Sequence, residues 1–233
     1  MEEFKMKKDG GKLLVLEGGD GSGKATQTRM LVERLRRQGR DVFTLDFPRY
    51  DETFGGKIAR AYLDGQFGDP KNIDPYLASI PYAMDRYESL PALHAQLNKG
   101  GLVVVDRFHT ANFIHQGAKM GISEDGQLNE PALHDLVSFL QRLEFELLGI
   151  PQPDLVLYLH VAPPVAQTLM DSQGRVKDGH EKDVAYAKKV ERVALWACEA
   201  LGWKLIECCP DEQTILSPEA VSDLIWNEVE RAI

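Results

Sequence analysis

The chain has 233 residues, of which 43% are hydrophobic and 27% charged, and its formal net charge at pH 7 is −9. This balance is typical of a globular protein, and the length suits one large domain whose core needs no disulfide or metal to hold it together. The negative charge argues against nucleic acid or an anionic membrane as a general partner, although local arginines can still bind a small anionic substrate.

The N-terminal residues and the cysteines argue against a secreted, membrane-spanning or zinc-binding protein. The first residues, MEEFKMKKDGGK, mix both charges and contain no apolar region of the signal-peptide type. No apolar run approaches the roughly 20 residues that a transmembrane helix needs. The three cysteines follow no metal-site spacing, so neither a zinc site nor a disulfide framework is indicated. We therefore expect a cytoplasmic protein.

Short apolar runs alternate along the chain with longer amphipathic segments. Apolar runs without alternation predict buried strands, and helical spacing of the segments between them predicts a parallel sheet covered on both faces. In chain order the predicted elements are a strand at 12–18, a helix at 26–38, a strand at 41–47, helices at 54–63 and 76–98, a strand at 101–106, a helix at 132–148, a strand at 154–161, a helix that opens at Pro163, a strand at 202–208 and a last helix that opens after Ser217.

The domain organisation is simple. We find no repeat, no low-complexity tract and no credible linker, so residues 1–233 are predicted to form a single domain. The most polar interruption is SQGRVKDGHEKD, residues 172–183, which we interpret as a mobile loop between helices. In parallel sheets of this kind, ligands bind at the carboxyl ends of the strands.

The segment LEGGDGSGKATQ joins the first strand to the first helix and contains a phosphate-binding loop. Glycine lets backbone N–H groups curl around phosphate oxygens, the helix N-terminus adds its dipole, and Lys24 would reach the β- and γ-phosphates of ATP. The predicted ATP-binding residues are Gly18, Gly19, Asp20, Gly21, Ser22, Gly23, Lys24, Ala25 and Thr26.

Ala25 departs from the usual motif, which ends in a serine or threonine whose hydroxyl helps to hold Mg²⁺. Thr26 is not a simple substitute, because the next residue of a helix points about 100° away. Mg²⁺ is held partly by substrate phosphates and keeps several waters, so a water can take the place of the hydroxyl. We expect weaker or differently hydrated metal with activity retained. A catalytically weakened nucleotide-binding protein is the alternative.

The third predicted strand ends in VVVDRFHTANFIHQG. An acid at the tip of a buried strand that faces a phosphate loop is the usual second anchor for Mg²⁺, held directly or through water, and here it is Asp106. Arg107 beside it can bind a phosphate through two parallel hydrogen bonds. An ion pair between these two neighbours at the strand end is the plainer alternative.

Two further segments carry arginines that could contact a second substrate, the acceptor of the phosphate. Arg49 follows the second strand in FPRY, and Tyr82 and Arg86 stand four residues apart in YAMDRYE, on one face of a helix. An aromatic ring and an arginine on one face can stack on a base and hydrogen-bond to it. On its own this pair is weak evidence, because aromatic residues at helical spacing usually belong to the core.

Together these segments resemble the thymidylate kinase family over nearly the whole chain, and NFIHQGAKMG and HEKD resemble a bacterial subgroup. The resemblance implies an α/β fold of the P-loop NTPase type. It is a three-layer sandwich with a five-stranded parallel sheet, flanking helices and a lid at about 172–183, assembled as a homodimer. It also implies transfer of the γ-phosphate of ATP to dTMP, with Mg²⁺, giving ADP and dTDP for dTTP synthesis.

The resemblance also implies roles around the transferred phosphate. Asp20 would meet the 3′-hydroxyl of the acceptor sugar and help to order the acceptor-side arginines, and Arg49 and Arg107 would clamp the acceptor phosphate. Arg175 in the lid would close over the transferring phosphate, and Gly21 fits the family type whose arginine lies in the lid. The residues expected to take part in catalysis are Lys24, Asp20, Arg107 and Arg175, with Lys177 and Lys182 as competing lid charges.

At the base, the resemblance implies that Tyr82 stacks on thymine, Arg86 meets the base edge and Asn112 hydrogen-bonds to N3. His115 and Gln116 would belong to the same substrate pocket.

Three positions depart from the family pattern: Ala25, Ala111 where serine is usual, and His115 where many members have tyrosine. The last two leave open the choice between thymidine and uridine nucleotides and between deoxyribose and ribose. Another nucleotide or nucleoside kinase is the main rival. A nucleoside kinase needs a carboxylate near the acceptor hydroxyl, and Asp51 and Glu52 lie close to Arg49 in the chain.

Overall fold

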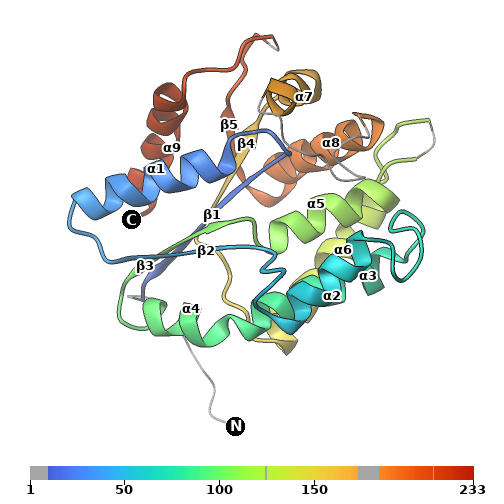
Figure 1. Ribbon diagram of the computed structural model, residues 1–233, viewed down its shortest axis with the longest axis horizontal. Coiled ribbons are helices and arrows are strands. Elements are labelled where there is room, and N and C mark those ends of the chain that lie inside the picture. The colour runs from blue at the N-terminus through green and yellow to red at the C-terminus, as the bar shows by residue number, and fades with distance from the viewer. Residues whose placement is uncertain (1–9, 124, 173–183, 212) are drawn as a thin grey trace.

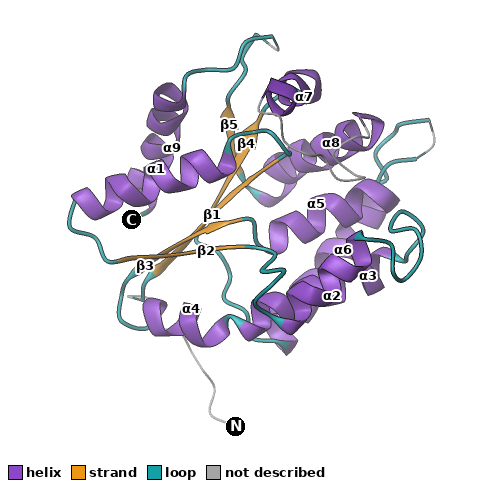
Figure 2. Ribbon diagram, viewed as in Figure 1, coloured by secondary structure: helices purple, strands orange, loops and turns teal. Residues whose placement is uncertain are grey.

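The computed structural model describes residues 10–123, 125–172, 184–211 and 213–233. At its centre lies a sheet of five parallel strands in the order β2-β3-β1-β4-β5, which confirms the predicted parallel sheet (Figure 2). The strands are β1 Lys12–Gly18, β2 Val42–Asp46, β3 Leu102–Asp106, β4 Leu155–His160 and β5 Lys204–Glu207.

Helices cover both faces of this sheet, and α1 and α9 lie on one side while α4 and α5 lie on the other (Figure 1). Among the described residues no helix is long and apolar enough to span a membrane. The helices are α1 Lys24–Arg37, α2 Phe54–Leu63, α3 Pro75–Glu88, α4 Leu90–Leu97, α5 His109–Met120, α6 Glu130–Gln141, the π-helix η1 Arg142–Leu147, α7 Pro163–Ser172, α8 Val184–Leu201 and α9 Pro218–Ala232.

Strand β1 shows why the sheet is buried on both faces. Its side chains alternate in direction, so Leu13 and Val15 join the core under α5 and α8, while Leu14 and Leu16 join the core under α1 and α9. All four are at most 1% exposed. Burying one such side chain stabilises the fold by about 1.5–3 kcal/mol, which explains why the strand reads as an unbroken apolar run.

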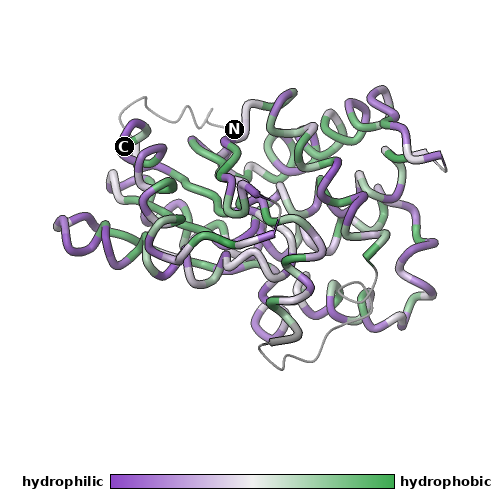
Figure 3. Tube along the Cα trace, turned by 90° about the horizontal axis from the view of Figure 1, so that it is seen from above, coloured by the Kyte–Doolittle hydropathy of each residue, from purple (hydrophilic) through white to green (hydrophobic). Residues whose placement is uncertain are grey.

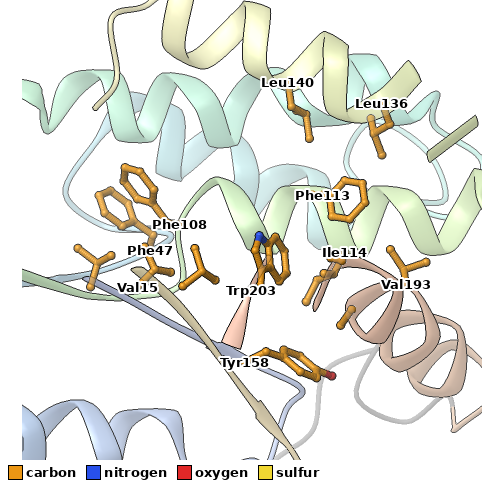
Figure 4. Close-up of a cluster of buried hydrophobic side chains, with 14 of the residues drawn as sticks. Val15, Phe47, Phe108, Phe113, Ile114, Leu136, Leu140, Tyr158, Val193 and Trp203 are labelled. Carbon is orange, nitrogen blue, oxygen red and sulfur yellow. The ribbon is translucent and has the colours of Figure 1, made fainter. Parts of the chain in front are cut away.

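Aromatic side chains fill the first of these cores. Phe47 and Phe108 pack edge to face at 5.8 Å, and Trp203 meets Phe113 of α5 at 6.0 Å (Figure 4). The trace coloured by hydropathy shows hydrophobic segments through the centre of the molecule (Figure 3). This packing fixes the start of α5, and therefore the edge of the sheet where the strands end.

Beyond shifts of one or two residues, as at α1, the helices differ from the predictions in three regions. The predicted helix at 76–98 is two helices, α3 and α4, which meet at Ser89, where Pro91 in the first turn of α4 lacks a backbone donor. The predicted helix at 132–148 begins at Glu130 and ends in the π-helix η1. Helix α5 was missed, because polar residues interrupt its apolar pattern.

Candidate active site

The carboxyl ends of β1, β2 and β3 open into a cavity of about 820 Å³. Its walls come from the loop before α1, from α2, α3 and α5, and from the beginning of α8 and α9. Most residues predicted for the site line it: Asp20, Gly21, Ser22, Gly23, Lys24, Ala25, Thr26, Tyr82, Arg86, Asp106, Arg107, Asn112, His115 and Gln116. Gly18, Gly19 and Arg49 do not.

The phosphate loop takes its shape from its glycines. Gly21 and Gly23 have φ of 80° and 82°, in the left-handed region that other residues avoid. Among the described residues no side chain caps the first N–H groups of α1, as suits an anion-binding helix start. Lys24 Nζ lies inside the loop and donates to the carbonyl oxygens of Gly18 and Gly19, at 2.8 Å each. Burial and the nearby Arg107 lower the pKa of Lys24.

Asp20 and Arg107 form an ion pair across the cavity wall. The sequence left open a pair between Asp106 and Arg107, whereas the structure pairs Arg107 with Asp20. Burial would raise the pKa of Asp20, but Arg107 and Lys24 outweigh it and hold the pKa below its usual range. Arg107 also has φ of 62°, which is uncommon for a residue with a side chain. Such backbone strain is often found at functional sites.

Glu17 lies beneath the loop and was missed by sequence reasoning. Its side chain is fully buried, accepting hydrogen bonds from Thr110 Oγ1 at 2.7 Å and from the backbone N of Gly18 at 3.0 Å. Burial raises the pKa of Glu17. An acid at the end of an otherwise apolar strand was the available signal. Glu17 joins the loop to the start of α5.

Two carboxylates at the ends of neighbouring strands are suited to a metal ion. Asp46 and Asp106 are paired in the register of β2 and β3, and both line the cavity beside Lys24. Burial raises the pKa of Asp106, and Lys24 and Arg107 oppose this. Among the described residues no cluster of three or more acids, histidines or cysteines could hold a metal alone. One or two carboxylates combined with substrate phosphates is, however, the usual environment of Mg²⁺.

The end of the cavity away from the phosphate loop combines hydrogen-bond donors that are held in place with hydrogen-bond acceptors that lack partners. Arg86 is 2% exposed and donates through Nε and Nη2 to Glu144, and through Nη1 to Phe108 O at 3.3 Å. Asn112 Nδ2 donates to Ser79 O at 3.1 Å. Within the described part of the chain, the buried Asn112 Oδ1 and Gln116 Oε1 have no hydrogen-bond partner. A ligand that offers N–H groups would satisfy them.

Arginines at the cavity differ from those expected. The guanidinium of Arg49 is bonded to Ser89 Oγ at 3.0 Å and paired with Glu52, and its side chain does not line the cavity. Arg60 and Tyr50, which sequence reasoning missed, both line it, with the guanidinium 3.9 Å from the ring centroid. The phosphate-clamping role of Arg49 remains a prediction, and Arg60 is a second candidate.

His115 meets a second residue that the sequence did not reveal. Its Nδ1 lies 3.3 Å from Tyr186 Oη, and this hydroxyl donates to the carbonyl oxygen of His115 at 3.1 Å. Tyr186 comes from the first turn of α8, directly after the predicted lid. The lid residues Arg175, Lys177 and Lys182 lie outside the described residues.

Comparisons with known proteins agree on one family. A sequence model of the thymidylate kinase family matches residues 16–213. The chain is 30% identical over 196 residues to the thymidylate kinase of Mycobacterium tuberculosis H37Rv, covering 82% of this chain and 87% of that one. It is 29% identical over 221 residues to the human thymidylate kinase, covering 91% and 92%. A solved thymidylate kinase structure from Candida albicans superposes with a TM-score of 0.71 at 21% identity, over 95% and 92% of the chains, and shows the same fold.

Proposed function

The chain belongs to the thymidylate kinase family, whose members are ATP-dependent nucleoside monophosphate kinases, and from this premise we propose that it phosphorylates dTMP. The γ-phosphate of ATP is transferred to a phosphate oxygen of dTMP, giving ADP and dTDP, which supplies dTTP synthesis. We further propose that the enzyme works in the cytoplasm with ATP as the donor and Mg²⁺ as the metal ion.

The observation that carries this proposal is the unsatisfied acceptor at the far end of the cavity. Asn112 donates through Nδ2 to Ser79 O, so its Oδ1 is the atom left to accept a hydrogen bond. Thymine and uracil carry a proton on N3, whereas cytosine presents a lone pair there. The fixed guanidinium of Arg86 beside Asn112 suits the O4 carbonyl of thymine and disfavours the amino group of cytosine.

Phosphoryl transfer needs little covalent help from the protein, because positioning and charge stabilisation supply most of the rate. In this proposal Lys24 and the loop amides hold the phosphates of ATP. Arg107, held by Asp20, faces the acceptor phosphate, with Arg49, Arg60 and the lid Arg175 as further cations. The acceptor oxygen is already ionised near neutral pH, so no general base is needed.

The carboxylates of Asp106 and Asp46 would hold the metal together with the phosphates of ATP. Bound there, Mg²⁺ neutralises charge on the β- and γ-phosphates. Ala25 offers no hydroxyl, so we expect a water in that coordination position. This proposal keeps Asp106 as the main metal residue.

We propose a homodimer formed through α3. Leu77, Ile80 and Tyr87 recur at helical spacing on this helix and are 63%, 42% and 45% exposed. Phe54 at the start of α2 and Leu147 in η1 are each 69% exposed; α2 packs against α3, and η1 is joined to α3 by the bond of Glu144 to Arg86. A second copy would cover these apolar side chains, which a lone chain leaves in water.

An acceptor panel tests the function. ADP release is followed in a coupled assay with Mg²⁺, ATP and one of dTMP, dUMP, dCMP, thymidine or no acceptor. We expect dTMP to be the best substrate, with dCMP at least about a hundredfold poorer, because a site built to meet N3–H leaves its acceptor unpaired with cytosine.

Other outcomes identify the rivals. A response to thymidine without a response to dTMP would make the protein a nucleoside kinase. ATP binding without ADP release from any acceptor at saturating Mg²⁺ would favour the weakened homologue. A preference for dUMP would indicate that Ala111 and His115 change which nucleotide the site accepts.

A further inference from the structure

The end of helix α6 has an unusual conformation. Its last turn is the π-helix η1, in which Leu148 N donates to Leu143 O at 3.1 Å and Ile150 N to Glu144 O at 2.8 Å. In an uninterrupted α-helix, the apolar row of α6 would continue to Leu147. Here Leu147 is 69% exposed, whereas Glu144 is fully buried. A π-turn is rare and is frequently found at functional sites.

The buried Glu144 contacts both residues that line the base end of the cavity. Its Oε1 accepts from Arg86 Nη2 at 2.6 Å and its Oε2 from Arg86 Nε at 2.7 Å, so the planar guanidinium is held at two points. Asn112 Nδ2 lies 3.5 Å from the same Oε1. One carboxylate therefore fixes the plane of Arg86 and favours a single orientation of the Asn112 amide.

Stability alone does not explain this pair. Arg86 and Glu144 are 2% and 0% exposed, and taking both charges out of water offsets most of their attraction. A well-packed apolar pair of the same volume would stabilise the core as well or better. The π-turn turns Leu147 away from the apolar row of α6, while Glu144 stays buried. A role in orienting the two neighbours accounts for the buried ion pair.

We propose that Glu144 is a positioning residue for base recognition, which makes the site selective for a pyrimidine that carries N3–H and a carbonyl at C4. Together with Ser79 O, which accepts from Asn112 Nδ2 at 3.1 Å, the carboxylate keeps Oδ1 turned toward the ligand. By holding Nε and Nη2 of Arg86, it leaves this guanidinium as a fixed donor. The inference rests on the proposed function and adds the source of its selectivity.

The substitution Glu144→Gln tests this directly. The new amide presents an N–H₂ group where one carboxylate oxygen accepted, so Arg86 loses a charged partner and the Asn112 amide keeps only Ser79 O of its two acceptors. A turned amide would offer N–H to N3 of cytosine. The matched control is Glu146→Gln, which removes the same charge from an exposed position of the same π-helix.

The measurement is kcat/KM for dTMP and for dCMP, with the KM for ATP and the melting temperature of each variant. We expect Glu144→Gln to lower the ratio of dTMP to dCMP kcat/KM by about tenfold or more, because one or two charge-assisted hydrogen bonds are lost. The KM for ATP should stay within about twofold, since the phosphate loop is untouched. Glu146→Gln should leave all these values unchanged.

A fall in activity with an unchanged dTMP-to-dCMP ratio would overturn the proposal, because a purely structural role weakens both substrates equally. Glu144→Asp covers the case in which the glutamine variant does not fold. It keeps the charge but withdraws the carboxylate by one methylene, and the ratio should fall by about threefold or more. An unchanged ratio there also overturns the proposal. Failure of the proposed function itself would show separately, as wild-type protein inactive on dTMP.

Discussion

At the residue scale, Arg107 links the central strand to the phosphate loop. Its backbone amide donates to Leu16 O at 2.9 Å, in the central strand, and its guanidinium is paired with Asp20 in the phosphate loop. The left-handed backbone directs this arginine while α5 begins two residues later. Arg107 is thereby held by strand β1 and by the loop that would bind ATP, and it stands just before the helix that carries Asn112.

Arg60 provides the first test at this scale. Arg60→Ala should raise the KM for dTMP by about tenfold, because it removes a cation from the cavity wall, and should leave the KM for ATP unchanged. Arg49→Ala is the informative comparison. A larger increase in KM for Arg49→Ala than for Arg60→Ala would show that Arg49 turns toward the acceptor phosphate, as the family resemblance implies.

Ala25 provides the second test at the residue scale. Ala25→Ser restores a hydroxyl at the start of α1, beside Lys24. If a water now fills this coordination position, the Mg²⁺ concentration for half-maximal activity should fall by about three- to tenfold. The experiment is a Mg²⁺ titration at fixed ATP. Identical curves for the two proteins would show that position 25 does not contact the metal.

The site residues differ in how visible they were in the sequence. The loop from Gly18 to Thr26 follows from local spacing, because its shape depends on neighbouring glycines. The role of Glu144 could not be predicted from the sequence, since it depends on contact with Arg86, which is 58 residues away in the chain. Tyr186 is likewise 71 residues from His115. Long-range pairs of this kind leave no periodic signal.

At the element scale, helix α8 is tied to the sheet by a histidine. His160 at the end of β4 contacts Glu191 of α8 at 2.8 Å through Nε2, and Glu207 of β5 at 2.7 Å through Nδ1. The bond to Glu191, with help from Glu207, outweighs burial and raises the pKa of His160 to about 9. The helix that follows the predicted lid is therefore anchored by a charged histidine at neutral pH.

This pKa gives a pH prediction. Because the folded state holds the proton more tightly than the unfolded chain, the stabilisation is complete below pH of about 6.5 and is lost as the pH rises through about 9. The difference in unfolding free energy between wild type and His160→Gln should shrink by about 1–2 kcal/mol from pH 6 to pH 10. Urea denaturation at several pH values measures it.

Glu191→Gln is the companion variant. Removing this acceptor should move the pH dependence toward the ordinary range of histidine, because the largest cause of the raised pKa is gone. A difference between wild type and His160→Gln that does not vary with pH would contradict the charged anchor.

The apolar face of α3 gives a second prediction for an element. Ile80→Glu should convert the proposed dimer into a monomer, because it buries a charge in the interface. Sedimentation velocity measures the mass. The matched control is Leu224→Glu, because this leucine is 38% exposed and belongs to α9, a helix that lies away from α3 (Figure 1). A dimer that survives Ile80→Glu would place the interface elsewhere.

The predicted elements were most accurate where one physical signal acts alone. The strand at 12–18 and the helix at 54–63 coincide with β1 and α2, since a buried run and an N-cap at Thr53 mark them clearly. The break at Ser89 and the π-turn after Gln141 were missed. Both serve tertiary contacts, and local periodicity continues through them.

At the scale of the whole molecule, a single cavity contains two binding regions, one suited to phosphates and one suited to a base. Backbone amides and Lys24 form one end, and the Asn112 amide and Arg86 form the other. Its volume of about 820 Å³ lies near the upper end of the range for small-molecule sites, about 300–1,000 Å³. The ion pair of Asp20 with Arg107 stands where the two substrates would meet.

The central claim is that a phosphoryl group passes directly from a nucleotide in the loop to a second nucleotide in the same cavity. The most direct test follows the label from ATP labelled at the γ-phosphate, with Mg²⁺ and with or without dTMP. We expect the label to appear in dTDP at the rate of ADP release, with little free phosphate. Label released as inorganic phosphate at the same rate whether or not dTMP is present would contradict the account.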